Sequence, residues 1–314
     1  MSEDATTSKS LAVEPVSLLC SFWYYRSDAH LERMRVAMQQ YTDRGGSVRM
    51  LVDSGAFSAH TQGTSIDADN YAAWLNDSCV PAWGDWMVGA FNLDVLGDAE
   101  ASLANWQRLN DLGQSTIPVV HLGDDANLFD PYIEQGADYV GFGGMVGKSA
   151  TRKRNWAQRT MRYLRDEHPH VRAHGLGVNA VSMMELPWYS VDSTAFNSSF
   201  LFGRLRLFDP RNGQMVKVVM SGGSGFDIDV SRMLRQYYGV NPEEVWSSGT
   251  HNRKLLAELS GTATSLMQQY YRRRHQVKPP PSRSNDFSGT VMHQVHWPKE
   301  VEAILKSDEY KETK

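Results

Sequence analysis

The 314-residue chain has few cysteines, no long apolar run and no excess of positive charge. Its two cysteines, Cys20 and Cys79, lie far apart and outside any CxxC pair. That excludes a disulfide framework and a cysteine-rich zinc site, and it favours a reducing compartment. Because no apolar run is long enough for a bilayer and the N-terminal MSEDATTSKSLAVEP lacks the apolar core of a signal peptide, we expect a cytoplasmic protein without membrane contact.

The formal net charge of -4 excludes a protein coated in positive charge. A nucleic-acid partner would therefore need a local basic face. Three groups of basic residues are candidates: Arg152, Lys153, Arg154 and Arg159; Arg204, Arg206 and Arg211; and Arg272, Arg273 and Arg274. Each group alone is also typical of an ordinary solvated surface.

The chain does contain a repeated alternation of short, β-rich apolar runs with longer amphipathic segments. The expected strands are Ser17–Tyr25, Val48–Asp53, Trp86–Asp94, Ile117–His121, Tyr139–Gly143, Arg172–Val178, Ser190–Phe196 and Val216–Met220. The expected helices between them are Ala29–Tyr41, Ala68–Asn76, Ala99–Leu112, Asn155–Glu167 and Val230–Tyr238. This alternation predicts an α/β fold with a parallel sheet, and the eight runs favour a closed (β/α)8 TIM barrel. The eighth run is the weakest, since residues 197–214 before it also suit an irregular excursion or a hairpin.

We expect a single domain with two flanking segments. Residues 1–15 are predicted to be disordered, residues 16–275 to form the barrel domain, and residues 276–314 to form an extended tail. A long helix is expected over Asn252–His275, followed by the proline- and serine-rich KPPPSRSNDFSG. A short final helix is expected over Val301–Lys306.

Polar residues occur where the expected strands end. Asp53, Asp94, His121 and Asp192 occupy such positions, and in a TIM barrel the active site is built at the carboxyl ends of the strands. Three carboxylates and a histidine are therefore expected around one mouth. Glycines at the other strand ends would let a flat ligand approach the backbone closely.

Each of these residues also has an ordinary structural interpretation. A strand-end aspartate often caps the next helix or makes an Asx-turn, as we expect of Asp98 and Asp124. An isolated His121 is typical of a satisfied, partly buried histidine. The segment GFGG alone suits a tight turn. Only the whole set, at successive strand ends, points to a site.

Six segments, in chain order, resemble motifs of the tRNA-guanine transglycosylase superfamily. They are VDSGAFS (52–58), NLD (92–94), VVHLGD (119–124), GFGGMVGK (141–148), HGLGVN (174–179) and VDSTAF (191–196). The resemblance covers roughly Ser17 to His275 and is strongest to the phage and bacterial DNA 7-deazaguanine (preQ0) transglycosylases. It implies an enzyme that replaces guanine in DNA with a 7-deazaguanine derivative, in the host cytoplasm if the chain is phage-encoded. Its implied partners are DNA, with tRNA as the alternative, and the small 7-deazaguanine base; a homodimer is possible, and no cofactor is expected.

Carried over position by position, the resemblance assigns roles to individual residues. Asp192 would be the nucleophile that attacks C1′, and Asp53 the general acid/base. Asp94 would accept hydrogen bonds from the N1–H and amino group of guanine. The other residues implied to bind the base are Ser54, His121, Gly143, Gly144 and Leu176. A nucleophilic carboxylate with a second acid/base group is what a two-step displacement with retention needs.

The basic residues expected to contact phosphates at the rim are Arg152, Lys153, Arg154, Arg204 and Arg206. Trp188, Tyr189, Phe200 and Phe202 suit either stacking on flanking bases or the core.

The sequence also departs from the family. Around His251, where the tRNA enzymes hold zinc with three cysteines and a histidine, there is no cysteine, so we expect no metal and loss of the zinc subdomain. His121 replaces a base-reading glutamine, and Ala56 and Ser58 depart from GGFQ. These losses favour DNA over tRNA. A queuine- or archaeosine-type tRNA transglycosylase, a non-catalytic nucleic-acid-binding relic and a sugar-hydrolase barrel remain alternatives.

Overall fold

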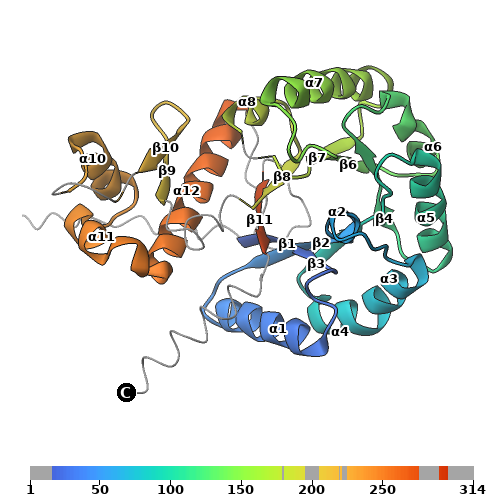
Figure 1. The fold of residues 1–314 in the computed structure, drawn as a ribbon, viewed down its shortest axis with the longest axis horizontal. Helices are drawn as coiled ribbons and strands as arrows, with labels where there is room; N and C mark the ends of the chain where they lie inside the picture. Colours follow the sequence, from blue (N-terminus) through green and yellow to red (C-terminus); the bar gives the residue numbers. More distant parts are fainter. Residues whose placement is uncertain are drawn as a thin grey trace, which may run out of the picture.

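The computed structural model describes residues 16–178, 180–194, 205–218, 220 and 225–275, and the backbone of 290–295. Within these ranges a sheet of parallel strands occupies the centre, and helices surround it (Figure 1). The α/β fold with a parallel sheet that the alternation predicts is confirmed.

The sheet strands run in the spatial order β4-β3-β2-β1-β11-β8-β7-β6-β5. Their bounds are β1 (Val16–Ser21), β2 (Val48–Asp53), β3 (Met87–Phe91), β4 (Thr116–Ile117), β5 (Val119–His121), β6 (Tyr139–Gly143), β7 (Arg172–Gly175), β8 (Ser190–Ser193) and β11 (Thr290–Val295). Every pairing that joins them is parallel. The two strands at the ends of this order, β4 and β5, are separated in the chain only by Pro118.

The helices that connect these strands begin at side-chain caps that the sequence provides. Ser27, Asp67, Asp98 and Ser149 each accept a hydrogen bond from a backbone N–H of the first turn, which stabilises the start of a helix. The connecting helices are α1 (Asp28–Asp43), α2 (Ala56–Thr61), α3 (Ala68–Trp74), the π-helix η1 (Leu75–Cys79), α4 (Val80–Trp83), α5 (Ala99–Asp111), the 3₁₀-helix η2 (Ala126–Phe129), α6 (Asp130–Ile133), α7 (Ala150–Glu167) and α8 (Val181–Met184). The expected cap at Asp98 is confirmed.

The expectation that Val216–Met220 supplies the eighth strand of the sheet is wrong. Residues 214–218 form β10 (Gln214–Val218), which pairs antiparallel with β9 (Leu205–Asp209) in a separate two-stranded hairpin. The turn DPRNG between them places Gly213 at a φ of 74°, a conformation that favours glycine and a hairpin. The position between β1 and β8 is taken by β11, which lies in the segment expected to be an extended tail.

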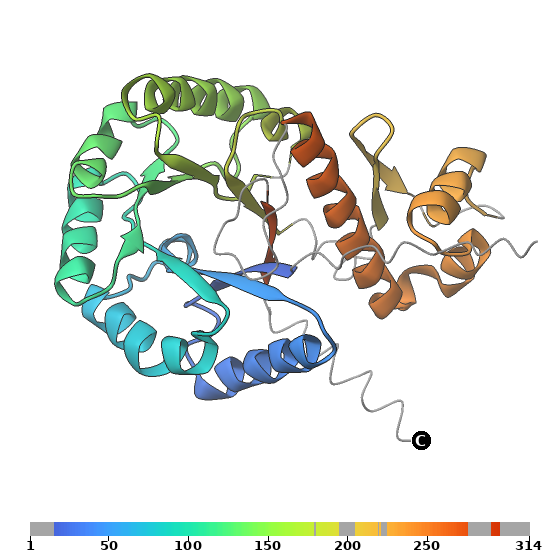
Figure 2. The same cartoon turned by 180° about the vertical axis from the view of Figure 1, so that it is seen from behind.

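The hairpin belongs to a lobe beside the sheet. The lobe also contains α10 (Ile228–Tyr237), α11 (Pro242–Ser248) and the 3₁₀-turn η3 (Gly249–His251). Helix α12 (Arg253–Arg274), the expected long helix, lies between the lobe and the sheet in both views (Figures 1 and 2). One apolar cluster joins Trp156 of α7, Leu256 of α12 and Leu234 of α10, so lobe and sheet share a continuous core.

The two faces of the sheet pack against different neighbours, because side chains alternate along a strand. Leu18 and Cys20 of β1 belong to a cluster with α1, α3 and α4, whereas Leu19 belongs to a smaller one with Leu51 and Phe91. The Phe91 ring of β3 lies 5.0 Å from that of His174 on β7, a strand that does not neighbour β3. We call the face that carries Leu19, Phe91 and His174 the inner face.

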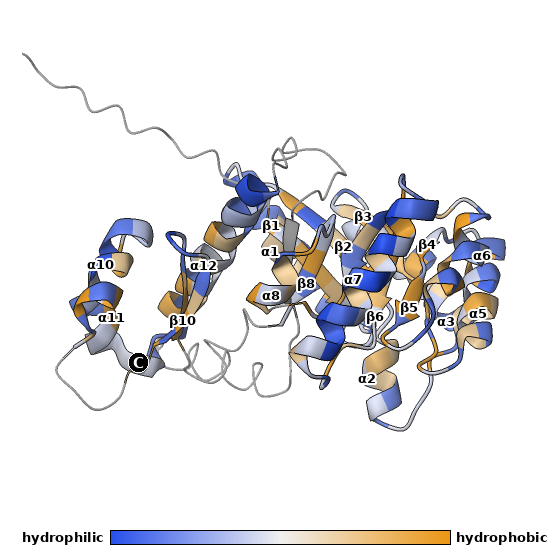
Figure 3. Ribbon diagram, turned by 90° about the horizontal axis from the view of Figure 1, so that it is seen from above, coloured by the Kyte–Doolittle hydropathy of each residue, from blue (hydrophilic) through white to orange (hydrophobic). Residues whose placement is uncertain are grey.

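The surrounding helices are amphipathic, and α7 shows a largely hydrophilic outer side (Figure 3). None of the described helices combines the length and the apolar character that a membrane crossing requires. The expectations for residues 1–15 and for a helix at 301–306 lie outside the described residues.

Candidate active site

The structure brings the three aspartates of the sequence prediction to the carboxyl ends of the parallel strands. Asp53 ends β2, Asp192 lies in β8, and Asp94 follows β3 by three residues. Burial, together with the negative charges of Asp94 and Asp192, raises the pKa of Asp53 to about 7. The Ser21 hydroxyl and the Gly55 amide act in the opposite direction. The three carboxylates are thus electrostatically coupled around one position.

Asp53 is fixed by the tight turn DSGAF. Its Oδ2 accepts a hydrogen bond from the Gly55 amide at 3.1 Å. Gly55 has a φ of 77°, and a Cβ there would lie 2.6 Å from the Trp23 Cβ, so only glycine lets the turn pack on β1 and its loop. Ser54, expected to bind the base, is fully buried, and its Oγ accepts from the Ala56 amide. Its described contact therefore supports a role in the turn.

Asp94 and His121 form a close pair that the sequence did not reveal. The Asp94 Oδ2 lies 2.6 Å from the His121 Nε2, and both side chains are largely buried. Burial lowers the pKa of His121, but the hydrogen bond with Asp94 and the charges of Asp94 and Asp124 outweigh it and raise that pKa. His121 therefore orients one oxygen of Asp94. Asp124, expected to cap a helix or make an Asx-turn, instead accepts from the His121 backbone N–H at 3.0 Å.

Gly143 and Gly144 allow the end of β6 to pack against His121. A Cβ at Gly143 would lie 2.7 Å from the Val119 Cγ1 and 3.0 Å from the His121 Cδ2. A Cβ at Gly144, whose φ is 67°, would lie 3.0 Å from the His121 Cβ. The Cβ side of both glycines is therefore occupied by protein atoms, and the expectation that their backbone meets a base stays a prediction.

Asp192 is only 1% exposed and is held by two hydrogen bonds. Its Oδ1 accepts from the Gly177 amide at 2.9 Å and lies 3.2 Å from the His174 Nε2. Gly177 has a φ of 70° in the turn after β7, and Leu176 in that turn packs partly buried against the inner apolar cluster. His174 was absent from the predicted site. The sequence feature that could have indicated His174 is the alternation of side chains along β7 and β8, which places His174 and Asp192 on the same inner face.

The basic residues expected at the rim that the structure describes lie on two elements, α7 and β9. Arg152 is exposed and Lys153 half-buried in the first turn of α7. Arg154 donates to the Ser182 carbonyl at 2.7 Å and to Glu185 at 2.8 Å, so it ties α7 to the α8 segment. Arg206 lies on the hairpin strand β9, and Arg204 lies outside the described residues.

Trp188, considered for base stacking, belongs to the core. It is 8% exposed, its ring packs edge-on against Phe142, and its Nε1 donates to the Met183 carbonyl. Tyr189 is half-buried beside Arg172. Phe200 and Phe202 lie outside the described residues.

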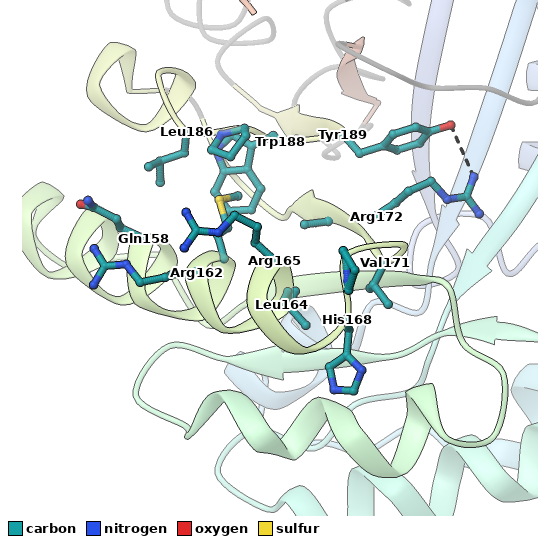
Figure 4. A pocket seen from close by; sticks show the side chains of 14 residues that line it. Gln158, Arg162, Leu164, Arg165, His168, Val171, Arg172, Leu186, Trp188 and Tyr189 are labelled. Carbon is teal, nitrogen blue, oxygen red and sulfur yellow. Dashed lines mark hydrogen bonds between the residues drawn. The ribbon is translucent and has the colours of Figure 1, made fainter.

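A cavity of about 630 Å³ lies elsewhere, between α7 and the starts of β7 and β8 (Figure 4). It is lined by Arg162, Arg165, His168, Arg172 and Tyr189, among others, and no carboxylate lines it. Because these residues lie on α7 and at the amino ends of the strands, the cavity is separate from the carboxylate cluster. Among the described residues, no group of three or more His, Cys, Asp or Glu side chains is arranged to hold a metal ion.

Comparison with known proteins adds no relative. No protein-family model matches the chain, and no curated protein matches it. The resemblance to the guanine transglycosylases therefore depends on the six motifs and on the site that they form.

Proposed function

We propose that the chain is a guanine transglycosylase that exchanges a base in DNA through a covalent Asp192–nucleoside intermediate. The observation that carries the proposal is the division between two carboxylates. Asp53 has a pKa of about 7, whereas Asp192 receives two hydrogen bonds on one oxygen. Retaining glycosyl transfer requires one carboxyl group that can hold a proton and a second that is positioned to attack, and these two aspartates suit those roles.

We further propose that the sheet closes into a (β/α)8 barrel. Supporting this, β3 pairs with β4, β5 pairs with β6, and only Pro118 separates β4 from β5. The Ile117 carbonyl accepts from Asn92 after β3, and the Pro118 carbonyl accepts from Gly141 on β6. If β4 and β5 are taken as one strand, the first and last strands of the sheet are the same strand and the sheet closes on itself. The inner face then becomes the interior of the barrel.

In the first step, a carboxylate oxygen of Asp192 forms a bond to C1′ as the C1′–N9 bond to guanine breaks. The electron pair of that bond goes to the guanine, which takes a proton from Asp53. A pKa of about 7 leaves a substantial fraction of Asp53 protonated at neutral pH, so it can serve as that acid.

In the second step, N9 of the incoming 7-deazaguanine attacks C1′ and the bond to Asp192 breaks. The proton of that N9 goes to the Asp53 carboxylate, which returns to its starting state. Leaving and entering bases thus share one acid/base group, so no net proton is consumed.

Asp94 suits the Watson–Crick edge of a guanine-type base. Among the described contacts, His121 engages only Oδ2 of Asp94, which leaves Oδ1 to accept from an N1–H and an amino group. A base that lacks those donors would leave a buried carboxylate unsatisfied, at about 1–3 kcal/mol or more.

The test is transfer of labelled guanine into DNA and into tRNA, measured side by side with the full chain. We expect label in DNA and little in tRNA. Label in tRNA alone would replace DNA by tRNA as the substrate, and label in neither polymer would reject the proposed reaction. Because a target base must leave its stack to reach a strand-end site, single-stranded DNA should exchange faster than duplex.

We predict that Arg152 and Lys153 contribute to DNA affinity without affecting base choice. Replacing both with alanine should reduce the slope of log affinity against log salt by about two, since each lost phosphate contact removes about 0.9. Arg154 is left in place because it bonds Glu185. The matched control replaces Arg162 and Arg165, farther along the same helix. Equal slopes for the first variant and wild type would mean that DNA enters by another face.

A further inference from the structure

Three polar side chains lie behind Asp192 on the inner face, two of them buried and the third, Tyr139, half-buried. Tyr139 begins β6, His174 lies in β7 and Ser190 begins β8. His174 is 0% exposed and Ser190 1%. Because strand side chains alternate, Ser190 and Asp192 share one face of β8, while Val191 between them packs into the outer core.

These side chains form a continuous hydrogen-bonded chain that ends on Asp192. The Tyr139 hydroxyl contacts the Ser190 Oγ, which lies 2.6 Å from the His174 Nδ1. On the other side of the ring, the His174 Nε2 lies 3.2 Å from the Asp192 Oδ1. The Tyr139 hydroxyl also lies 3.3 Å from Nδ1.

The chemistry of these groups assigns a direction to every hydrogen bond. An ionised Asp192 can only accept, so the His174 Nε2 must carry a proton. In a neutral imidazole Nδ1 is then an acceptor, and Ser190 must donate to it. The single hydroxyl proton of Ser190 is thereby used, so Tyr139 must donate to Ser190. A doubly protonated His174 would reverse the chain and leave the Tyr139 proton without an acceptor among the described contacts.

We propose that His174 is a positioning residue that aims the nucleophilic carboxylate, with Ser190 and Tyr139 fixing its tautomer. This inference rests on the proposed function of Asp192. Both described donors to Asp192, the His174 Nε2 and the Gly177 amide, contact Oδ1. Oδ1 is the anchored oxygen, and Oδ2 is the one that attacks C1′.

The arrangement also predicts which step His174 affects. It is enclosed in the interior and its proton is directed at Asp192, so it has no described route to the substrate itself. Losing it should misdirect the attacking oxygen and slow the chemical step. Base binding at Asp94 and His121 should continue, so KM should change little.

The experiment combines kinetics with a measurement that needs no substrate. His174→Ala should reduce kcat by about a hundredfold, the effect expected of a misplaced reacting group, with little change in KM. His174→Gln restores an N–H near the position of Nε2 and should recover kcat to within about tenfold of wild type. His168→Gln is the matched control, because His168 bonds Asp130 away from the strand-end carboxylates and should leave kcat unchanged. In nitrogen-15 histidine NMR of the wild-type chain, the His174 ring should be the neutral Nε2–H tautomer, assigned through its loss in His174→Gln.

Each outcome decides one question. A kcat for His174→Ala within twofold of wild type, or no better rate in His174→Gln, would overturn the positioning role. A protonated Nδ1 in the NMR spectrum would overturn the hydrogen-bond direction, even if the alanine variant fails to fold. Failure of the wild-type protein to exchange any base would instead reject the proposed function. The NMR result would still decide the direction of the hydrogen bonds between Tyr139, Ser190, His174 and Asp192.

Discussion

Asp192→Asn is expected to abolish base exchange, with kcat reduced by about 10⁴-fold or more, as for removal of other catalytic nucleophiles. Asparagine keeps an oxygen that can accept from the Gly177 amide and the His174 Nε2. It removes the negative charge that attacks C1′. The variant should therefore fold, which thermal unfolding can check, while labelled-guanine exchange falls to background.

Asparagine is a sharper test than alanine at this position. Asp192→Ala would leave a buried His174 N–H without a partner, at about 1–3 kcal/mol of stability, and would mix folding with chemistry. Asp209→Asn is the matched control, because Asp209 is also a buried aspartate but pairs with Arg211 in the lobe hairpin. Near-normal exchange by a folded Asp192→Asn protein would remove Asp192 from the mechanism.

Asp53→Asn is expected to give the second large effect, a loss of about 10²–10⁴-fold in kcat, typical of a missing general acid. The first step needs protonated Asp53, whose pKa is raised to about 7 by burial and by the charges of Asp94 and Asp192. Wild-type kcat/KM should therefore be full below about pH 7 and decline above it. Asp53→Asn should lack that decline, and a decline that persists unchanged in the variant would assign it to another group.

The same pKa predicts an effect on stability that needs no substrate. The folded chain holds a proton on Asp53 between its ordinary pKa of 3.8 and about 7, where the unfolded chain has lost it. The stabilisation from this proton is therefore fully present below about pH 4 and lost as the pH rises through about 7. At about 1.4 kcal/mol per pH unit, the loss is at most about 4 kcal/mol.

Asp53→Asn cannot titrate and should escape this loss. Its free energy of unfolding relative to wild type should rise between about pH 4 and 7 and then level off, as measured by urea unfolding. Asp69→Asn serves as a control carboxylate, because Asp69 is exposed and its pKa is instead lowered by Arg108. If the difference in free energy of unfolding between Asp53→Asn and wild type did not change with pH, Asp53 would be ionised at neutral pH.

Much of the fold could be predicted because local patterns and tertiary packing agree. The runs at Val48–Asp53 and Tyr139–Gly143 coincide with β2 and β6, since each is apolar and ends in turn residues. The placement of Asp53, Asp94 and Asp192 at strand ends follows from this alternation. Parallel strands in sequence order bring their carboxyl ends to one edge.

The eighth strand was missed because strand patterns do not reveal pairing partners. Val216–Met220 has a suitable composition, but the DPRNG turn before it pairs it locally with β9. β11 follows a proline-rich stretch that is typical of a tail, and it reaches the sheet only through long-range pairing with β1 and β8.

The contacts within the site were less predictable than its position. Asp94 and His121 lie 27 residues apart in the chain, and His174 and Asp192 lie 18 residues apart. Arg154 resembles its neighbours Arg152 and Lys153 in sequence, yet only contact with Glu185 on another segment shows that it is engaged. Side-chain partners across strands depend on three-dimensional packing, which residue spacing alone does not specify.

The most direct test of the mechanism is mass spectrometry. The full chain is denatured during turnover on single-stranded DNA, the DNA and the protein are digested, and the peptides are analysed. We predict that the peptide containing Asp192 carries a covalently attached deoxyribose from the DNA, without a base. The adduct should be absent from Asp192→Asn. It should also disappear when free guanine is added in excess before denaturation. Exchange of labelled guanine with no adduct on Asp192, or an adduct on another residue, would contradict the account.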